Sequence, residues 1–317
     1  MELREVYAAR RRIRGLVRET PLEPSPFLSG LCGGEVWLKL ENLQLTGSFK
    51  IRGALNKLLQ LSGEERRRGV VAASSGNHAQ GVGYAARRLG VDATIVVPLH
   101  TPEVKLDAIR RYGVNLIVHG EEYMDAERLA RRIEREEGKT FVSGYNDLDV
   151  IAGQGTLGLE MVEEKPELDV VLVPVGGGGL ISGVGCVFKA ALDAEVLGVQ
   201  SVASPVMAES VRQGRIVDIN LKESVAEGLH GGIEEDSVTF DLCRSLVDDF
   251  ILVREESIVE AIRLLLTRQR QVVEGAGAVG AAAIMENPER FRGRRVGVVV
   301  SGGNLDPGLL RAAARGA

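Results

Sequence analysis

Residues 170–180 read VVLVPVGGGGL, and this stretch decides the fold. Six consecutive apolar residues, Val170–Val175, are typical of a parallel strand that is buried on both faces of its sheet. Four glycines, Gly176–Gly179, follow at once, and they allow backbone N–H groups at the start of the next helix to converge on an anion. The stretch therefore predicts a covered parallel sheet with an anion site at the end of one strand.

The same pattern extends along the chain, where short β-branched runs alternate with amphipathic helical segments. We expect strands at Val36–Leu40, Val70–Ala73, Ala93–Val97, Asn115–Val118, Thr140–Val142, Val170–Val175, Val196–Val202, Phe250–Val253 and Val296–Val300. We expect helices at Tyr84–Leu89, Glu103–Tyr112, Ala126–Glu136 and Ser257–Arg268. This alternation predicts βαβ units and an α/β fold with parallel-rich sheets flanked by helices.

Length and composition narrow the class of protein. The chain has 317 residues, which favours two lobes, because single cores stop growing near ~250–300 residues. A formal net charge of −5 argues against a nucleic acid or an anionic membrane as partner. Three cysteines without a CxxC pair fit a reduced compartment. With no signal-peptide-like segment and no long apolar run, the sequence predicts a cytoplasmic protein.

A second loop of small polar residues, SSGNHAQG at 74–81, follows the predicted strand Val70–Ala73. Such a loop at a helix start offers free N–H groups and a favourable dipole to an anion, and a substrate carboxylate would suit it. An ordinary N-cap by Ser74 or Ser75, with His78 on the surface, explains one serine but not the whole string.

A lysine at a helix start supplies a candidate nucleophile. In TGSFKIRG, residues 46–53, Lys50 begins a helical pattern that runs to about Leu61. A lysine amine becomes nucleophilic near neutral pH when burial or a nearby cation lowers its pKa, although a single helix lysine more often faces solvent. Ser301, in SGGN at 301–304, follows the strand Val296–Val300 and is expected at the same edge of the sheet.

The glycine run also has a dinucleotide-binding alternative. That fingerprint requires a third glycine where Ser182 stands and an acidic residue at the end of the next strand. The strand Val196–Val202 ends without one, and the chain has no Walker lysine. A single phosphate monoester fits the run better.

Taken in order, these motifs resemble the serine/threonine dehydratase group of pyridoxal-phosphate enzymes, which are related to the tryptophan synthase β-subunit and include serine racemase. The resemblance runs from Glu41 through IAGQGT at 151–156 to SGGN at 301–304. It implies the two-domain fold type II. A small domain, residues 46–141, would carry the Schiff-base lysine and be inserted in a large domain made of residues 1–45 and 142–317. The active site would lie in the cleft between them.

The resemblance also assigns roles to residues. Lys50 would hold the cofactor as a Schiff base, with Phe49 against its ring, Asn77 on its ring hydroxyl and Ser301 at its ring nitrogen. The full set of cofactor-binding residues that it implies is Phe49, Lys50, Asn77, Gly176, Gly177, Gly178, Gly179, Leu180, Glu274 and Ser301. The substrate carboxylate would meet Ser74, Ser75, Gly76 and His78. Lys50 and Ser75 are the predicted catalytic residues.

The implied reaction is β-elimination. A neutral hydroxyl at Ser301 does not favour a protonated ring nitrogen, which weakens the electron sink and favours prompt loss of a β-leaving group. The leading function is an L-threonine/L-serine ammonia-lyase that yields 2-oxobutanoate or pyruvate and ammonia. Racemisation by Lys50 and Ser75, dehydration of 3-hydroxyaspartate, and a non-catalytic ligand-binding relative are the alternatives. The run SGYND, residues 143–147, departs from the usual His-Pro-Phe-Asp-like run of threonine dehydratases and leaves the substrate open.

Two further expectations concern a metal and assembly. Glu223 and Glu227 stand where several members of the group hold a cation, which suggests Mg²⁺ or another divalent ion. Their i, i+4 spacing also fits solvated charges on a helix. The resemblance implies a homodimer or homotetramer that acts on a small amino acid.

Overall fold

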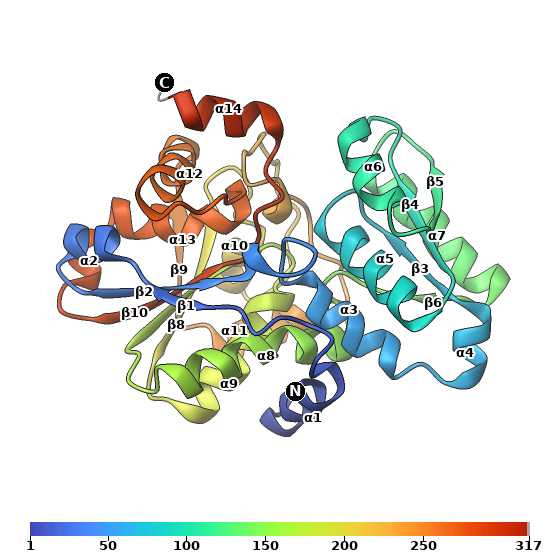
Figure 1. The fold of residues 1–317 in the computed structure, drawn as a ribbon, viewed down its shortest axis with the longest axis horizontal. Coiled ribbons are helices and arrows are strands. Elements are labelled where there is room, and N and C mark those ends of the chain that lie inside the picture. The colour runs from blue at the N-terminus through green and yellow to red at the C-terminus, as the bar shows by residue number, and fades with distance from the viewer. Residues whose placement is uncertain (316–317) are drawn as a thin grey trace.

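Apolar strands form two sheets in the computed structural model, which describes residues 1–315 (Figure 1). The larger sheet has the strand order β1-β2-β10-β7-β8-β9. Its strands are β1 (Leu22–Pro24), β2 (Glu35–Leu40), β7 (Val170–Pro174), β8 (Glu195–Ser201), β9 (Asp249–Val253) and β10 (Arg295–Val300). All pairs are parallel except β1 with β2, where Leu22 lies opposite Lys39.

The smaller sheet is parallel throughout, in the order β5-β4-β3-β6. Its strands are β3 (Val70–Ala73), β4 (Ala93–Val97), β5 (Asn115–Val118) and β6 (Thr140–Phe141). Each predicted strand is confirmed, with ends that agree to within one residue. The sequence missed β1, because three residues ending in a proline at a sheet edge carry no periodic signal.

Helices connect and cover these strands. They are α1 (Leu3–Ile13), α2 (Pro26–Cys32), α3 (Lys50–Leu59), α4 (Gly63–Arg68), α5 (Asn77–Leu89), α6 (Glu103–Arg110), α7 (Tyr123–Glu137), α8 (Leu148–Glu164), α9 (Gly179–Ala191), α10 (Val206–Gln213), α11 (Val238–Leu246), α12 (Glu255–Gln269), α13 (Gly275–Glu286) and α14 (Pro307–Arg315). Three short 3-10 turns, η1 (Glu41–Leu43), η2 (Glu227–Leu229) and η3 (Pro288–Phe291), complete the described elements.

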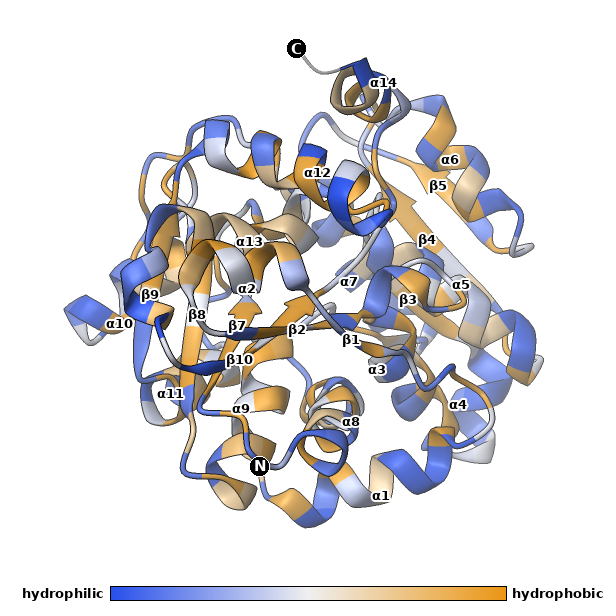
Figure 2. Ribbon diagram, turned by 60° about the vertical axis from the view of Figure 1, so that its left-hand side comes forward, coloured by the Kyte–Doolittle hydropathy of each residue, from blue (hydrophilic) through white to orange (hydrophobic). Residues whose placement is uncertain are grey.

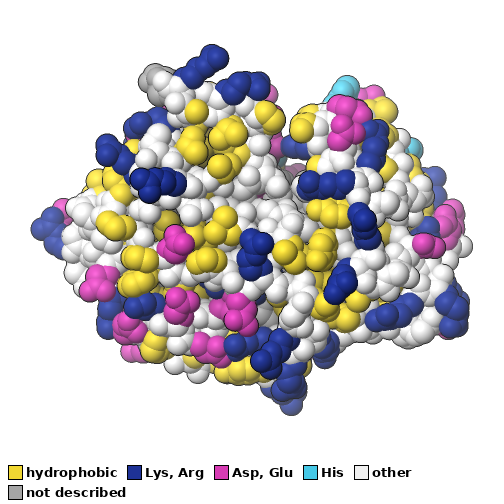
Figure 3. All heavy atoms as spheres, viewed as in Figure 1, with side chains coloured by type: hydrophobic (Ala, Val, Ile, Leu, Met, Phe, Trp, Pro, Cys, Tyr) yellow, Lys and Arg dark blue, Asp and Glu magenta, His cyan; other side chains and the backbone are white. Residues whose placement is uncertain are grey.

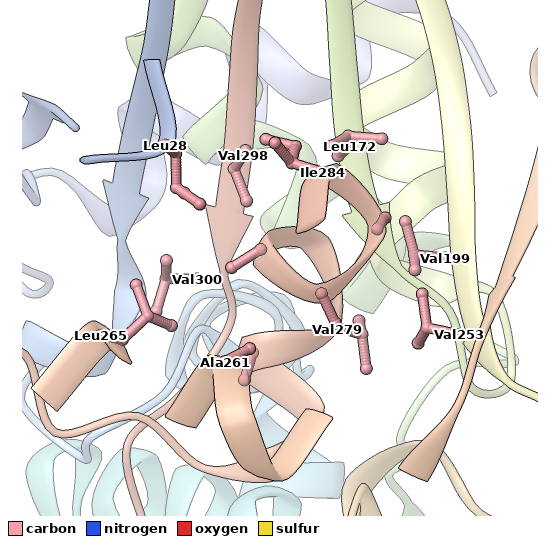
Figure 4. Packing of buried hydrophobic residues seen from close by; sticks show 14 of the residues in the cluster. Leu28, Leu172, Val199, Val253, Ala261, Leu265, Val279, Ile284, Val298 and Val300 are labelled. Carbon is pink, nitrogen blue, oxygen red and sulfur yellow. The ribbon is translucent and has the colours of Figure 1, made fainter. Parts of the chain in front are cut away.

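Alternate residues of the central strands pack on opposite sides of the larger sheet. Val170 and Leu172 join the core beneath α2, α12 and α13 (Figure 4). Val171 and Val173 join a second core with α8 and α9 on the other side. The strands are accordingly apolar along their length while the outer helix faces are polar (Figure 2). This two-sided burial confirms the prediction made from residues 170–175.

The smaller sheet is covered in the same way. α3, α5 and α6 pack on one face, and α7 packs on the other. Ile13 and Val150 share the core beneath α3 although they lie outside residues 46–141. The domain boundaries at residues 46 and 141 therefore stay a prediction.

The surface is hollowed between the bodies built on the two sheets (Figure 3). The first turn of α3 and the turn after β10 meet beside this hollow, as described below. Within residues 1–315, no helix combines the length and apolar character needed to cross a bilayer.

Candidate active site

Lys50 is a buried amine at the first residue of α3. Its Nζ donates to the carbonyl oxygen of Gly144 at 2.7 Å. Burial lowers the pKa of Lys50 to about 8, against an opposing effect of the Glu274 carboxylate. A substantial fraction of the amine is therefore neutral near physiological pH, as a nucleophilic lysine requires. The solvent-facing alternative does not hold.

The turn that follows β10 fixes the backbone just before Lys50. Ser48 and Gly302 form an isolated antiparallel bridge. The Phe49 N–H donates to the carbonyl oxygen of Ser301 at 3.1 Å. Ser301 itself is buried, with 3% of its surface exposed. The structure thus brings together Phe49, Lys50 and Ser301, although about 250 residues of sequence separate the serine from the other two.

A chain of amide and carboxylate groups lies beside this turn. Asn77 Nδ2 donates to Glu274 Oε1 at 2.6 Å, and Asn304 Nδ2 donates to Asn77 Oδ1 at 2.6 Å. Burial raises the pKa of Glu274 to about 7, although the bond from Asn77 lowers it. Asn304 also donates to the Thr46 carbonyl oxygen at 3.0 Å, so the orientation of the Asn77 amide is fixed from both sides. The sequence motif contains Asn304 but gives no sign of this role.

The four glycines are packed against the protein itself. A Cβ on Gly177 would lie 2.4 Å from Tyr145 Cγ, and one on Gly179 would lie 2.9 Å from Tyr145 Cα. Gly178 has φ +87°, which side-chain-bearing residues rarely adopt. Thr239 Oγ1 donates to the Gly177 carbonyl oxygen at 2.6 Å. The sequence did not point to Tyr145 or Thr239, since neither contact leaves a local pattern.

The loop Ser74–His78 differs from the glycine loop in its surroundings. No atom of residues 1–315 lies within 4 Å of a Cβ built on Gly76, and Ser74 and Ser75 are half-buried. His78 is buried rather than on the surface, and its Nε2 donates to the Val142 carbonyl oxygen at 2.8 Å. Burial, with the Lys50 charge, lowers the pKa of His78 to about 3, so the ring is neutral. In this tautomer Nδ1 accepts rather than donates, so the carboxylate role of His78 stays a prediction.

The predicted cation residues lie apart from this cluster. Glu227 begins η2 and forms an ion pair with Lys105 of α6, while Glu223 lies in an irregular segment, so the two do not share a helix face. The carboxylate that orders this segment is Glu255, which accepts from Ser224 Oγ at 2.8 Å and from the Val225 N–H at 2.7 Å. Among residues 1–315, no three His, Cys, Asp or Glu side chains gather in a metal-binding arrangement.

This arrangement agrees with a family of known proteins. A family model described as "Pyridoxal-phosphate dependent enzyme" matches residues 13–302. The chain belongs to this family. The resemblance to pyridoxal-phosphate enzymes and the fold type predicted from the sequence are therefore confirmed.

Individual relatives in the pyridoxal-phosphate family are similar over nearly the whole chain. The L-threonine ammonia-lyase of Thermotoga maritima is 47% identical, over 97% of this chain and 77% of its own. A solved threonine deaminase, of the source abbreviated T.th., has 41% identity and a TM-score of 0.90, and the match covers 96% of this chain and 99% of its own. Maize serine racemase has 33% identity and a TM-score of 0.94, with 99% and 97% coverage.

The residues of this chain fit the family's cofactor. Lys50 supplies a buried amine with a pKa of about 8, and the glycine loop begins α9 with its N–H groups at the helix N-terminus. Three buried polar atoms in the segments that converge on Lys50 have no hydrogen-bond partner among residues 1–315. They are Thr46 Oγ1, Ser48 Oγ and His78 Nδ1. Unpaired buried polar atoms are costly, and their gathering here is expected of a site that completes its hydrogen bonds with a ligand.

Proposed function

We propose that this protein is a pyridoxal-phosphate-dependent L-threonine/L-serine ammonia-lyase that produces a 2-oxo acid and ammonia. The observation that carries the proposal is the buried Lys50 amine, held where the loops after β3, β7 and β10 converge. A threonine ammonia-lyase at 47% identity and a threonine deaminase at 41% identity support the substrate class.

The cofactor would be held by residues from both sheets. Gly176–Gly179 and the N–H of Leu180 would take its phosphate, Lys50 its aldehyde carbon and Asn77 its ring hydroxyl. When bound, pyridoxal phosphate supplies the electron sink that makes a C–H bond beside an amino group acidic. Everything else in the reaction falls to side chains of this chain.

Lys50 Nζ, once displaced by the substrate amine, is the base that takes the proton from the α-carbon. Its lowered pKa places it near the working pH, where general bases are most effective. The β-hydroxyl of the substrate then leaves as water. Ser301 opposes a long-lived carbanion, because its neutral hydroxyl does not stabilise a proton at the ring nitrogen as a carboxylate would.

The substrate carboxylate would be held by the loop Ser74–Gly76. Gly76 faces open space, and α5 presents its N-terminus directly after it. An anion is favoured at that end of a helix by the free N–H groups and the helix dipole. The loop would therefore orient the α-hydrogen toward Lys50.

The test replaces Lys50 with Ala. We expect K50A to lose the visible absorbance of the bound cofactor and at least about a thousandfold in kcat with L-threonine, since both the attachment point and the base are gone. Lys57→Gln, on the same helix, is the matched control and should keep both properties. Full turnover by K50A would refute the scheme.

Racemisation is the second candidate, favoured by the half-buried Ser75 beside the Lys50 site and by the likeness to maize serine racemase. It is separated by incubating the enzyme with L-serine, L-threonine and threo-3-hydroxyaspartate and measuring 2-oxo acid and D-isomer separately. D-serine formed faster than pyruvate would overturn the lyase proposal. A dominant rate with threo-3-hydroxyaspartate would change its substrate.

The divalent cation and the assembly are part of the same proposal. Glu223 and Glu227 would hold Mg²⁺ or a related ion if Glu227 exchanged its Lys105 partner for the metal. Chelation followed by Mg²⁺ addition, with the E227Q variant as control, measures that dependence. Sedimentation at several concentrations tests the expected homodimer or homotetramer, and a concentration-independent monomer would exclude both.

A further inference from the structure

Four charged side chains form a buried network behind Lys50. Arg52 and Glu41 are completely buried, Lys39 is 1% exposed, and the Glu160 side chain is 10% exposed. They come from β2, η1, α3 and α8, and their two positive and two negative charges cancel. Arg52 lies two residues after Lys50, in the same turn of α3.

The guanidinium of Arg52 grips two carboxylates at once. Its Nε and Nη2 donate to Glu41 at 2.8 Å each, and its Nη1 and Nη2 donate to Glu160 at 2.6 and 2.9 Å. Nη1 also donates to Thr156 Oγ1 at 3.1 Å. Burial works against the charged form, yet the two carboxylates raise the pKa of Arg52 above its ordinary value. Such a planar fork fixes both position and orientation, which a lysine ammonium cannot do.

The next residue of α3 is held against α8 as well. The Gly53 N–H donates to Gln154 Oε1 at 3.1 Å. A Cβ on Gly153 would lie 2.6 Å from the Gly53 Cα, so the two helices cross at backbone contact. Together with the bonds of Ser48 and Phe49 to the turn after β10, these contacts tie the backbone on both sides of Lys50.

A stability role alone explains this network poorly. Replacing buried ion pairs by well-packed apolar residues is often neutral or stabilising, so buried charges are weak evidence for stability. What the fork adds is a unique placement of the first turn of α3. That turn carries the amine on which the proposed reaction depends.

We propose that Arg52 is a positioning residue for Lys50. Its forked bonds to Glu41 and Glu160 lock the first turn of α3 against η1 and α8, so that the Lys50 amine stays beside the Gly144 carbonyl and the turn after β10. This inference rests on the proposed function, in which Lys50 holds the cofactor and moves the α-proton.

The experiment compares R52K with K39M. R52K keeps the charge and removes the fork, whereas K39M removes a buried charge that bonds Glu160 and the Thr20 carbonyl oxygen but not Arg52. The main measurement is the rate at which each apoenzyme captures pyridoxal phosphate at Lys50, followed by absorbance and trapped with borohydride. Melting temperature and the separate values of kcat and KM for L-threonine accompany it.

We expect both variants to melt at lower temperature, but only R52K to capture the cofactor at least about tenfold more slowly and to lose kcat more than KM. Equal capture rates in R52K and K39M, or wild-type capture by R52K, would overturn the positioning role. If wild-type protein forms no borohydride-reducible attachment at Lys50, the proposed function falls and this inference falls with it.

A milder pair keeps the test decisive if R52K does not fold. T156V removes an acceptor of Arg52, while T20V removes a hydroxyl that bonds Glu41 only at the edge of the network. We expect T156V to slow capture about threefold and T20V to leave it within experimental error of the wild type. Equal rates in the two valine variants overturn the proposal.

Discussion

Two loops of this enzyme follow buried parallel strands and lead into helices, yet their glycines have opposite surroundings. In Gly176–Gly179, after β7, a Cβ on Gly177 or Gly179 would collide with Tyr145. After β3, a Cβ on Gly76 would meet nothing within 4 Å among residues 1–315. The first loop is glycine-rich because the protein itself fills the space, and the second is open where a substrate carboxylate is expected.

The difference teaches that a glycine motif has two possible physical reasons. At Gly177 the absence of a side chain is a packing requirement, so substitution should act through stability and the shape of the phosphate loop. At Gly76 the absence leaves room, so substitution should act through substrate binding. The two loops can therefore be distinguished by which measured quantity changes.

The largest effect is expected from G177A. Its Cβ must displace Tyr145, and overpacking of a well-packed site costs about 1–3 kcal/mol. We expect the free energy of unfolding to fall by that amount, with slower capture of pyridoxal phosphate by the apoenzyme. Chemical denaturation of G177A, Y145A and the double variant measures the coupling between the two residues. Strictly additive losses would contradict the packing explanation.

His78 sharpens the comparison through pH. Its pKa is about 3 in the folded protein, against about 6.5 unfolded, so below pH 6.5 the unfolded chain binds a proton that the fold does not. Stability contributed by neutral His78 is therefore complete above pH 6.5 and is lost as pH falls, by at most about 1.4 kcal/mol per pH unit. Between pH 6.5 and 5.5, H78Q should lose less stability than the wild type.

The control for that measurement is H100Q, which removes an exposed histidine. Titrations of Glu274 and other groups occur in all three proteins and cancel in the differences. An identical pH dependence of unfolding in H78Q and the wild type would show that His78 takes up its proton in the folded state.

G76A tests the open loop directly. Its φ of −122° lies in a region open to alanine, and no described atom opposes the new methyl group. We expect an unchanged melting temperature and a KM for L-threonine that rises about tenfold, which corresponds to about 1.4 kcal/mol. A large loss of stability with unchanged KM would reverse the assignment of the two loops.

The smallest effect concerns the charge that faces Lys50. The rate of cofactor capture should rise with pH and level off near the Lys50 pKa of about 8, because the neutral amine is the nucleophile. Since the Glu274 carboxylate raises that pKa, E274Q should move the midpoint to lower pH. Glu286→Gln, at the far end of α13, is the matched control, and a midpoint near 10.5 in the wild type, the ordinary lysine value, would show that Lys50 is solvated.

Much of the fold followed from local patterns. Runs such as Val170–Val175 and Val296–Val300 identified buried strands to within one residue, because burial on both faces of a sheet leaves a continuous apolar run. The order of four motifs was enough to predict the family, which is confirmed by the match over residues 13–302. The individual roles given to Asn77, Ser75 and the other site residues stay predictions.

What the sequence could not supply were contacts between distant segments. Tyr145 against the glycine loop, Asn304 on Asn77, and Arg52 between Glu41 and Glu160 each join residues that no local period relates. Glu223 and Glu227 show the converse, since their helical spacing suggested a shared face that the irregular backbone does not form.

The sequence by itself determined the alternation of strands and helices and the chemistry that follows each strand, because both depend on neighbouring residues. Only the tertiary structure decided that Lys50 is buried, that its pKa falls to about 8, and that Arg52 and the turn after β10 hold it in place. The physical reason is that desolvation and charge pairing depend on which distant groups surround an amine, and the chain must fold before those groups meet.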